Sequence, residues 1–155
     1  MKLTIAWIGK SKSNSNSNSK DSAIQSLADE YLKRLSRYAE TKGIALKDEA
    51  ALTAHANPKN QTRPVLVLLD SRGQQLSSEE LAQFIRDHQQ RSSQPLLFAI
   101  GGADGFTDQT RRAANFTLSL GKMTLAHELA RVVLLEQLYR AFTILARHPY
   151  HLGHA

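Results

Sequence analysis

The chain has no cysteine, few aromatic side chains and no long apolar run. Without cysteine it can form neither a disulfide nor a thiolate metal site, and it has no cysteine nucleophile. Its longest apolar runs, residues 64–69 and 132–135, are far shorter than the roughly 20 residues that cross a bilayer. The N-terminus lacks the apolar core and cleavage site of a signal peptide. These absences predict a cytoplasmic protein without a membrane segment.

The composition predicts one globular domain with a basic surface. A chain of 155 residues with 41% apolar side chains is long enough to bury a core and too apolar to be disordered. The 20 Lys and Arg against 14 Asp and Glu give a net charge of +6. Such a surface attracts polyanions, so nucleic acid is the first candidate partner, although many basic proteins bind none.

The N-terminal part contains a low-complexity segment and an irregular one. Residues 11–20 repeat Ser and Asn between lysines, which predicts a flexible surface loop within the single domain 1–155. From Asp21 to a point before Gly43, apolar side chains recur every three or four residues and predict a helix. Residues 44–50 are consistent with a short strand, whereas residues 51–62 show no clear period.

Four apolar segments alternate with helical patterns. Residues 2–8, 64–69, 95–100 and 115–120 predict strands, and the second and third are apolar throughout, as buried strands of parallel sheets are. Helices are predicted after Ser77 and over residues 107–114. The alternation predicts an α/β fold, a parallel sheet flanked by helices. Ligands bind such sheets at the carboxyl ends of strands, which makes loops 70–75, 101–106 and 121–125 the candidate site.

The last predicted helix, residues 125–147, is apolar on nearly all sides. A surface helix of a monomer shows one apolar stripe, so this helix is expected to lie between the sheet and the second subunit of a homodimer. His127 and Arg131 are four residues apart beside the third loop, and they are either functional groups or an exposed polar pair. Glu136 and Arg140 have the same spacing and predict a structural ion pair.

Four motifs in the last third of the chain carry a resemblance to a known family. They are residues 101–106 (GGADGF), 119–127 (SLGKMTLAH), 131–141 (RVVLLEQLYRA) and 149–151 (PYH). Their order, spacing and position resemble the ribosomal large subunit methyltransferase H family, RlmH. The chain length and the strands at residues 2 and 64 extend the resemblance over the whole sequence.

The resemblance implies a fold, partners and a reaction. Family members have a SPOUT-type fold, a parallel α/β sheet whose C-terminal segment forms a trefoil knot, and they act as homodimers. They transfer a methyl group from S-adenosyl-L-methionine to N3 of a pseudouridine in helix 69 of 23S rRNA on assembled ribosomes, without a metal. Carried over to this sequence, the cofactor contacts are Leu69, Gly102, Gly121, Lys122, Met123, Thr124, Leu125 and Ala126.

These positions fall in or beside the three candidate loops. Glycine backbone can approach adenosine closely, and Leu69, Met123 and Leu125 can supply apolar walls. Taken alone, Met123 would be assigned to the core. Two departures from the family are Ala126, where proline is common, and the longer ending after His151.

Methyl transfer requires mainly that a deprotonated N3 be aligned behind the sulfonium methyl group. Because the imide is weakly acidic, a nearby base or cation should assist. The candidates for this chemistry are His127 and Arg131, followed by Tyr150 and His151. The candidates for binding RNA phosphates are Lys122, Arg140 and Arg147.

Other classes of protein are also considered. A non-catalytic RNA-binding protein with a SPOUT-like body predicts no cofactor binding. A dinucleotide site at residues 101–105 is disfavoured, because the spacing does not match G-x-G-x-x-G and no acidic residue follows about 20 positions later. A P-loop NTPase is excluded by the lack of its motif.

Overall fold

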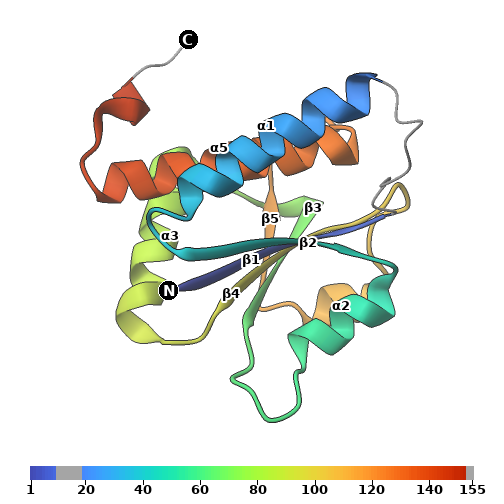
Figure 1. Cartoon of the computed structure of the whole chain (residues 1–155). Helices are drawn as coiled ribbons and strands as arrows, with labels where there is room; N and C mark the ends of the chain where they lie inside the picture. The colour runs from blue at the N-terminus through green and yellow to red at the C-terminus, as the bar shows by residue number, and fades with distance from the viewer. Residues whose placement is uncertain (10–18, 153–155) are drawn as a thin grey trace.

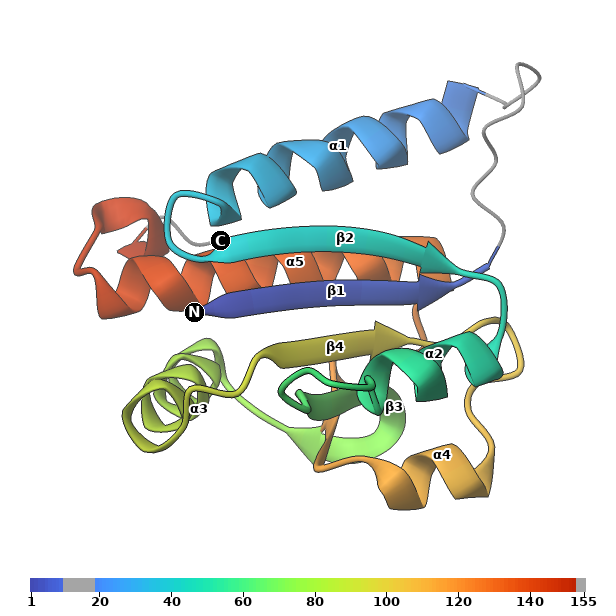
Figure 2. The same ribbon diagram turned by 60° about the horizontal axis from the view of Figure 1, so that its bottom comes forward.

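The computed structural model describes residues 1–9 and 19–152. Within these residues, five strands form one sheet in the order β2-β1-β4-β3-β5, and every pair of neighbours is parallel (Figures 1 and 2). The strands are β1 (Lys2–Ile8), β2 (Glu40–Leu46), β3 (Val65–Gln75), β4 (Leu96–Ile100) and β5 (Phe116–Ser119). The helices are α1 (Ser19–Leu35), α2 (Glu49–Ala56), α3 (Ser78–Arg91), α4 (Asp108–Ala113) and α5 (His127–Leu145), with a 3-10 turn, η1 (Pro149–Leu152). The predicted parallel α/β sheet is confirmed.

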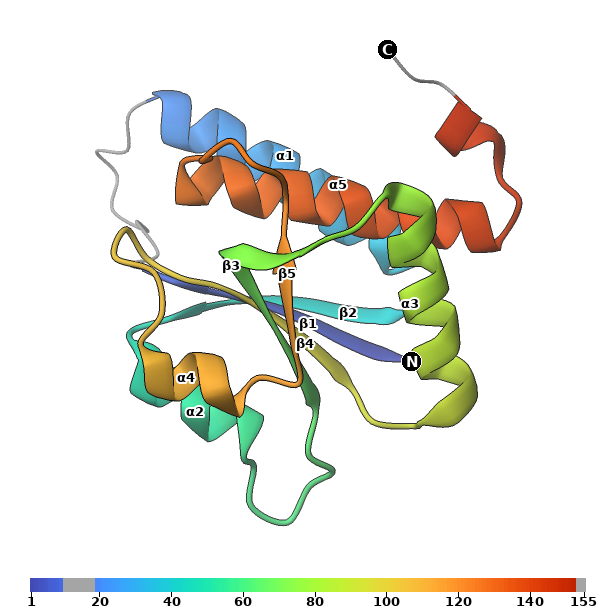
Figure 3. The same cartoon turned by 180° about the vertical axis from the view of Figure 1, so that it is seen from behind.

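Helices cover both faces of the sheet. Helices α1, α3 and α5 pack on one face and α2 and α4 lie against the other, as Figures 1 and 3 show from opposite sides. Successive strand residues point to opposite faces, so Phe98 joins the core under α1, α3 and α5 while Ala99 joins the core on the α2 side. All five residues of β4 are buried, because this strand lies in the middle of the sheet.

The N-terminal half differs from the sequence prediction in three places. The first helix begins at Ser19, so the last two residues of the predicted loop 11–20 belong to α1, and residues 11–18 lie outside the described part. This helix ends at Leu35, and β2 occupies residues 40–46 rather than 44–50. Residues 49–56 form α2, which begins with the Asp48 side chain accepting a hydrogen bond from the Ala51 amide at 2.9 Å.

Strand β3 continues through the segment that was predicted as a loop after Asp70. Leu69 and Gln74 both lie opposite Leu118 of β5, so residues 70–73 bulge out of the ladder. Gly73 of this bulge lies close against β5, because a Cβ on it would lie 2.6 Å from the carbonyl oxygen of Thr117. The bulge lets β3 keep its pairing while the chain turns toward α3.

Helices α3 and α5 pack on the same face of the sheet, and α5 is covered there by α1 and α3 of its own chain, while the expected contact with a second subunit stays a prediction. A capping box opens α3, in which the Glu80 amide donates to Ser77 Oγ and the Ser77 amide donates to Glu80 Oε1. Helix α5 packs between α1, α3 and the sheet, and Leu134, Leu135 and Leu138 are fully buried there. None of the helices in the described part of the chain combines the length and hydropathy that a membrane crossing takes.

Candidate active site

The three candidate loops meet at one cavity. It lies at the carboxyl ends of β3, β4 and β5 and has a volume of about 340 Å³. Its walls come from residues 69–72, from residues 100–105, and from residues 118–121 and 123–125. The side chains of Arg111, His127 and Ala130 complete the lining. This is the position where open parallel sheets bind ligands.

The loop after β4 brings three glycines, Gly101, Gly102 and Gly105, to the cavity wall. The Gly105 amide donates to the Gly102 carbonyl at 3.0 Å, which closes the loop into a tight turn. A Cβ added to Gly102 would find as its nearest neighbour the Ile8 carbonyl oxygen, at 3.8 Å. A ligand can therefore approach the main chain here without meeting a side chain.

The loop after β5 is held by a buried serine. The Gly121 amide donates to Ser119 Oγ at 3.2 Å, and the same hydroxyl donates to the Gly121 carbonyl at 2.9 Å. Gly121 has φ +140°, which favours glycine. Met123, which alone would be assigned to the core, is 86% exposed at the edge of the cavity. That reading was wrong because Met123 lies in a loop rather than on a packed helix face.

The structure places six of the eight expected cofactor contacts on the cavity wall. These are Leu69, Gly102, Gly121, Met123, Thr124 and Leu125. Lys122 and Ala126 are exposed and are not part of the lining. Ala126 is the N-cap residue of α5 and makes no side-chain capping bond. Contact of these residues with a cofactor stays a prediction.

His127 and Arg131 share a face of α5, but their side chains have different neighbours. His127 borders the cavity, is about half exposed and lies 3.9 Å from a carboxylate oxygen of Glu128. Arg131 is not part of the cavity lining and is only 7% exposed. Its guanidinium lies 4.3 Å from the ring centroid of Trp7 and donates to Gln25 Oε1 at 3.2 Å.

The burial of Arg131 is only partly compensated. Among the described residues, its Nε atom has no hydrogen-bond partner and no carboxylate lies within ion-pair distance. Burial lowers the pKa of Arg131, and the more distant charges of Asp29 and Glu128 oppose this. Trp7, whose ring supports the guanidinium, was not identified from the sequence, because nothing in a strand pattern marks one aromatic residue as a partner.

The C-terminal candidates lie away from the cavity, where Tyr150 packs against the middle of α5. The Tyr150 hydroxyl donates to Glu136 Oε1 at 3.1 Å and lies 3.3 Å from the Tyr31 hydroxyl. Burial raises the pKa of Tyr150, and its bonds to Tyr31 and Glu136 raise it further. Arg140 Nη2 donates to Glu136 at 2.6 Å, which confirms the predicted ion pair. Neither Tyr150 nor His151 lines the cavity.

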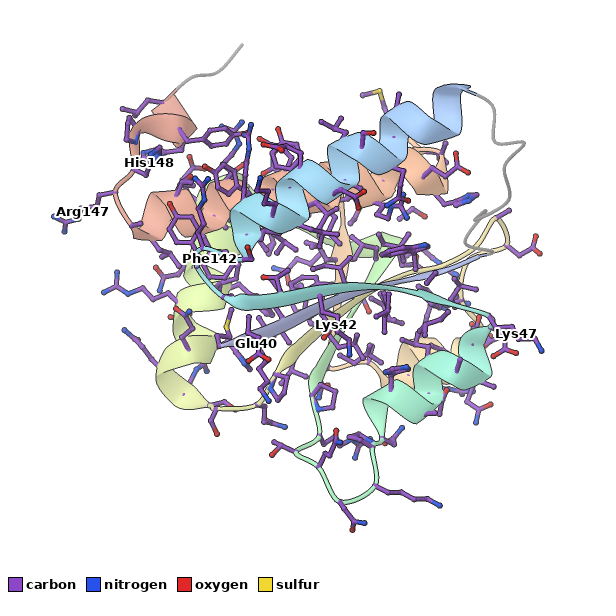
Figure 4. All side chains as sticks on the ribbon, in the orientation of Figure 1. Glu40, Lys42, Lys47, Phe142, Arg147 and His148 are labelled. Atoms are coloured by element: carbon purple, nitrogen blue, oxygen red, sulfur yellow. The ribbon has the colours of Figure 1, made fainter. Side chains whose placement is uncertain are left out.

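The three candidates for binding RNA phosphates differ in how accessible their side chains are. Arg140 is engaged with Glu136, and its guanidinium lies 5.1 Å from the ring centroid of Tyr150. Arg147 is exposed after the end of α5, and Figure 4 shows it projecting away from the body of the protein beside His148. Lys122 is exposed next to the cavity. Arg147 and Lys122 are therefore the accessible members of the set.

Asp70, Arg72 and Arg111 form an ion-pair network at the cavity that was not predicted from the sequence. Asp70 accepts hydrogen bonds from the backbone amide of Arg72 at 2.8 Å and from Arg72 Nε at 3.4 Å. Arg111 Nη1 lies 3.5 Å from the other oxygen of Asp70. Burial raises the pKa of Asp70, but these contacts outweigh it and hold the pKa below its ordinary value. Asp70 therefore stays ionised in the cavity wall.

Two larger cavities lie elsewhere. One of about 470 Å³ is formed mainly by α2, α4 and the loop before β3, and one of about 800 Å³ lies at the amino ends of the strands. Neither includes the glycine loops or the carboxyl ends of the strands, so the cavity of about 340 Å³ is the better candidate for the ligand site. Residues 1–9 and 19–152 contain no cluster of three His, Asp or Glu that could hold a metal ion.

Comparison with known proteins identifies the class and then the family. A family model described as "Predicted SPOUT methyltransferase" matches residues 1–151, so the chain belongs to the SPOUT methyltransferases. It is 54% identical over 154 residues to the ribosomal RNA large subunit methyltransferase H of Koribacter versatilis, which covers 99% of this chain and 100% of that protein. The protein of the same name from Geobacter sulfurreducens is 39% identical over 160 residues, covering 97% and 99%. Within the class, the chain belongs to the ribosomal RNA large subunit methyltransferase H family.

Solved structures agree on the fold. The SpoU methyltransferase AviRb from Streptomyces viridochromogenes, in complex with the cofactor AdoMet, matches with a TM-score of 0.53 and 13% identity, over 90% of this chain and 57% of that one. A probable methylase family protein from Haemophilus influenzae matches with a TM-score of 0.55 and 15% identity, over 96% and 69%. The expected SPOUT-type fold is confirmed, and the trefoil knot stays a prediction.

Proposed function

We propose that this chain methylates N3 of a pseudouridine in helix 69 of 23S rRNA on the assembled ribosome, with S-adenosylmethionine as methyl donor. The observation that carries the proposal is the cavity at the ends of β3, β4 and β5, bordered by two loops that contain glycine. Full-length relatives bear the name of a large-subunit rRNA methyltransferase, which supports ribosomal RNA as the substrate. A ribosomal substrate places the protein in the cytoplasm.

The cavity suits the methyl donor in size and chemistry. Its volume is within the range of small-molecule sites, roughly 300–1,000 Å³. Leu69, Leu118 and Leu125 supply apolar walls, and Gly102 leaves its backbone open to the ligand. The bound cofactor supplies an electrophilic methyl group on a sulfonium centre. The protein's own task is then to align N3 and to accept its proton.

His127 is the proposed proton acceptor. It borders the cavity, and its exposure leaves room for a nucleotide to approach. Imidazole is the side chain best suited to exchange protons near neutral pH. As the N3 proton passes to the imidazole, the nitrogen lone pair bonds to the methyl carbon and the carbon–sulfur bond breaks, which leaves a neutral thioether. Arg131 lies outside the cavity wall, so its expected part in this step stays a prediction.

We infer that the active form is a homodimer. Helix α5 begins at His127, and the Tyr150 hydroxyl bonds to Glu136, nine residues further along the helix and so about 14 Å away. The roles expected of Tyr150 and His151 at the methyl group therefore require a second copy of the chain. Leu27 on α1 and Leu129 on α5 are each 46% exposed and offer apolar surface for the contact. Light scattering after size-exclusion chromatography measures the mass in solution.

The test uses labelled cofactor with intact ribosomes and with bare 23S rRNA, followed by mapping of the modified nucleotide. The expected product is one methylated pseudouridine, formed on ribosomes. His127→Asn should lower turnover by about 10²-fold or more while cofactor affinity stays within a few-fold. His55→Asn, at an exposed position on α2, is the matched control and should not change turnover. If calorimetry detects no cofactor binding, the non-catalytic RNA-binding reading replaces this proposal.

A further inference from the structure

Arg111 joins two walls of the cavity through three contacts. Its Nη1 atom donates to the carbonyl oxygen of Phe106 at 2.6 Å and lies 3.5 Å from Asp70 Oδ2, while Nη2 pairs with Asp108 on the same helix. Phe106 ends the glycine loop after β4, and Asp70 is the first residue of the β3 bulge. One guanidinium therefore connects loops that come from two neighbouring strands.

The contact to Asp70 ties Arg111 to a group that cannot easily move. The Asp70 side chain is only 8% exposed, and its other oxygen is held by the amide and the side chain of Arg72. If Arg111 turned away, this buried carboxylate would lose a cationic partner, which is costly in a water-poor site. The Phe106 carbonyl, next to a side chain that is 4% exposed, is similarly confined.

Phe106 packs with Leu66 and Leu68 of β3 in the core, but among the described residues only Arg111 makes hydrogen bonds to both loops. The β3–β4 ladder ends at the pair Leu69 and Ile100, just before both loops begin. The hydrogen bond from Gly105 to Gly102 lies within the glycine loop and does not reach β3. Arg111 bridges the gap beyond the last ladder pair, and its own side chain forms part of the cavity lining.

We propose that Arg111 is a positioning residue of the cofactor site and sets the distance between the β3 bulge and the glycine loop before the cofactor binds. The identity of the ligand rests on the proposed function. A cavity that is formed in advance spares binding the entropy cost of ordering two loops, so loss of the clamp weakens affinity even if the ligand makes no bond to Arg111. Lysine is a poor substitute, because its single ammonium lacks the planar fork that reaches two acceptors at once.

The experiment compares Arg111→Ala and Arg111→Lys with Arg112→Ala. Arg112 is the matched control, because it is the next residue on α4, is exposed and forms no ion pair among the described residues. Calorimetry gives the dissociation constant of S-adenosylmethionine. Hydrogen exchange in the cofactor-free protein gives the protection of amides 101–106, a readout that depends on no ligand and no activity.

The expected result is a tenfold or greater rise in the dissociation constant for Arg111→Ala, a smaller rise for Arg111→Lys and none for Arg112→Ala. Amides 101–106 should exchange faster in Arg111→Ala, while those of β1 and β4 keep wild-type protection. Asp70→Asn should show the same local pattern, and it provides the test if Arg111→Ala does not fold.

Wild-type affinity in Arg111→Ala, or a loss of protection spread evenly over the whole sheet, overturns the proposal, because the residue then acts only on global stability or not at all. If the wild-type protein binds no S-adenosylmethionine, the proposed function fails. The exchange of amides 101–106 still decides whether Arg111 holds the loops. The two proposals therefore fail in different measurements.

Discussion

Replacing Gly73 by alanine should separate β3 from β5. A Cβ at this position would lie 2.6 Å from the Thr117 carbonyl oxygen, 2.7 Å from its carbonyl carbon and 2.8 Å from that of Leu118. All three atoms belong to the backbone, so no flexible side chain can move aside. An ordinary contact begins at 3.4 Å, so the two strands must move apart by several tenths of an ångström at the bulge.

The size of the effect follows from three contributions, of which two destabilise the folded state and one stabilises it. Overpacking of this kind typically costs about 1–3 kcal/mol, and the weakened pairing of Gln74 and Gln75 with β5 adds about 1 kcal/mol. The smaller entropy of alanine in the unfolded chain offsets only about 0.4–1 kcal/mol. The expected loss in the free energy of unfolding is therefore about 1–3.6 kcal/mol. In a protein of this size it should lower Tm by roughly 2–14 °C.

Urea and thermal unfolding of Gly73→Ala, followed by circular dichroism at fixed protein concentration, measure the loss. Gly102→Ala is the matched control. Its Cβ meets nothing closer than 3.8 Å, so stability should stay within about 0.5 kcal/mol of wild type. The reasoning is refuted if Gly73→Ala unfolds at the wild-type urea midpoint, because the close approach to Thr117 would then carry no energetic consequence.

Two further predictions concern acid stability and the buried arginine. Glu49 accepts hydrogen bonds from Thr107 and Thr110, and although burial raises the pKa of Glu49, these bonds hold it below the ordinary value of 4.5. The carboxylate therefore contributes stability above pH 4.5, and this stability is lost as the pH falls through the folded-state pKa of Glu49. Urea titrations between about pH 6 and about pH 3 measure this loss. In Glu49→Gln the free energy of unfolding should fall less steeply over this range than in the wild type. Arg131→Ala should cut turnover and, by removing the guanidinium over Trp7, should also lower the free energy of unfolding by about 1–2 kcal/mol. Unchanged turnover with this loss of stability would contradict a functional role for Arg131 and leave only the structural one.

The sequence predicts elements best where burial leaves a continuous pattern. The apolar runs of β3 and β4 and the capping box of α3 were identified, because each is a local signal. Helix α2 was missed because it buries only Leu52 and Ala56, and several alanines around them blur the period. Strand β2 was shifted because it lies at the edge of the sheet, where polar residues such as Glu40 and Lys42 face solvent (Figure 4).

The location of the site could be predicted from the sequence, but the pairs of residues that contact each other there could not. Sheet geometry brings the ends of parallel strands together, so three loops could be selected before their distances were known. The pair of Asp70 and Arg111 spans 41 residues, and no periodic pattern joins residues that far apart. The same holds for Trp7 and Arg131, which meet only because the end of β1 and the start of α5 lie on the same side of the sheet. Long-range pairs of this kind depend on tertiary structure.

The cavity itself follows from a mismatch in strand length. Strand β4 ends at Ile100 and gives way to two glycines, whereas β3 continues to Gln75 by inserting residues 70–73 opposite a single position of β5. The extra residues cannot lie in the ladder, so they leave the sheet beside the loop that follows β4. The two glycines at the start of that loop have no side chains to fill the space. Gly73 permits this bulge by lying against β5, and Arg111 holds its far side to the glycine loop. A larger residue at Gly73 should therefore disturb the cavity as well as the sheet, and cofactor affinity in Gly73→Ala should fall even at temperatures where the variant is fully folded.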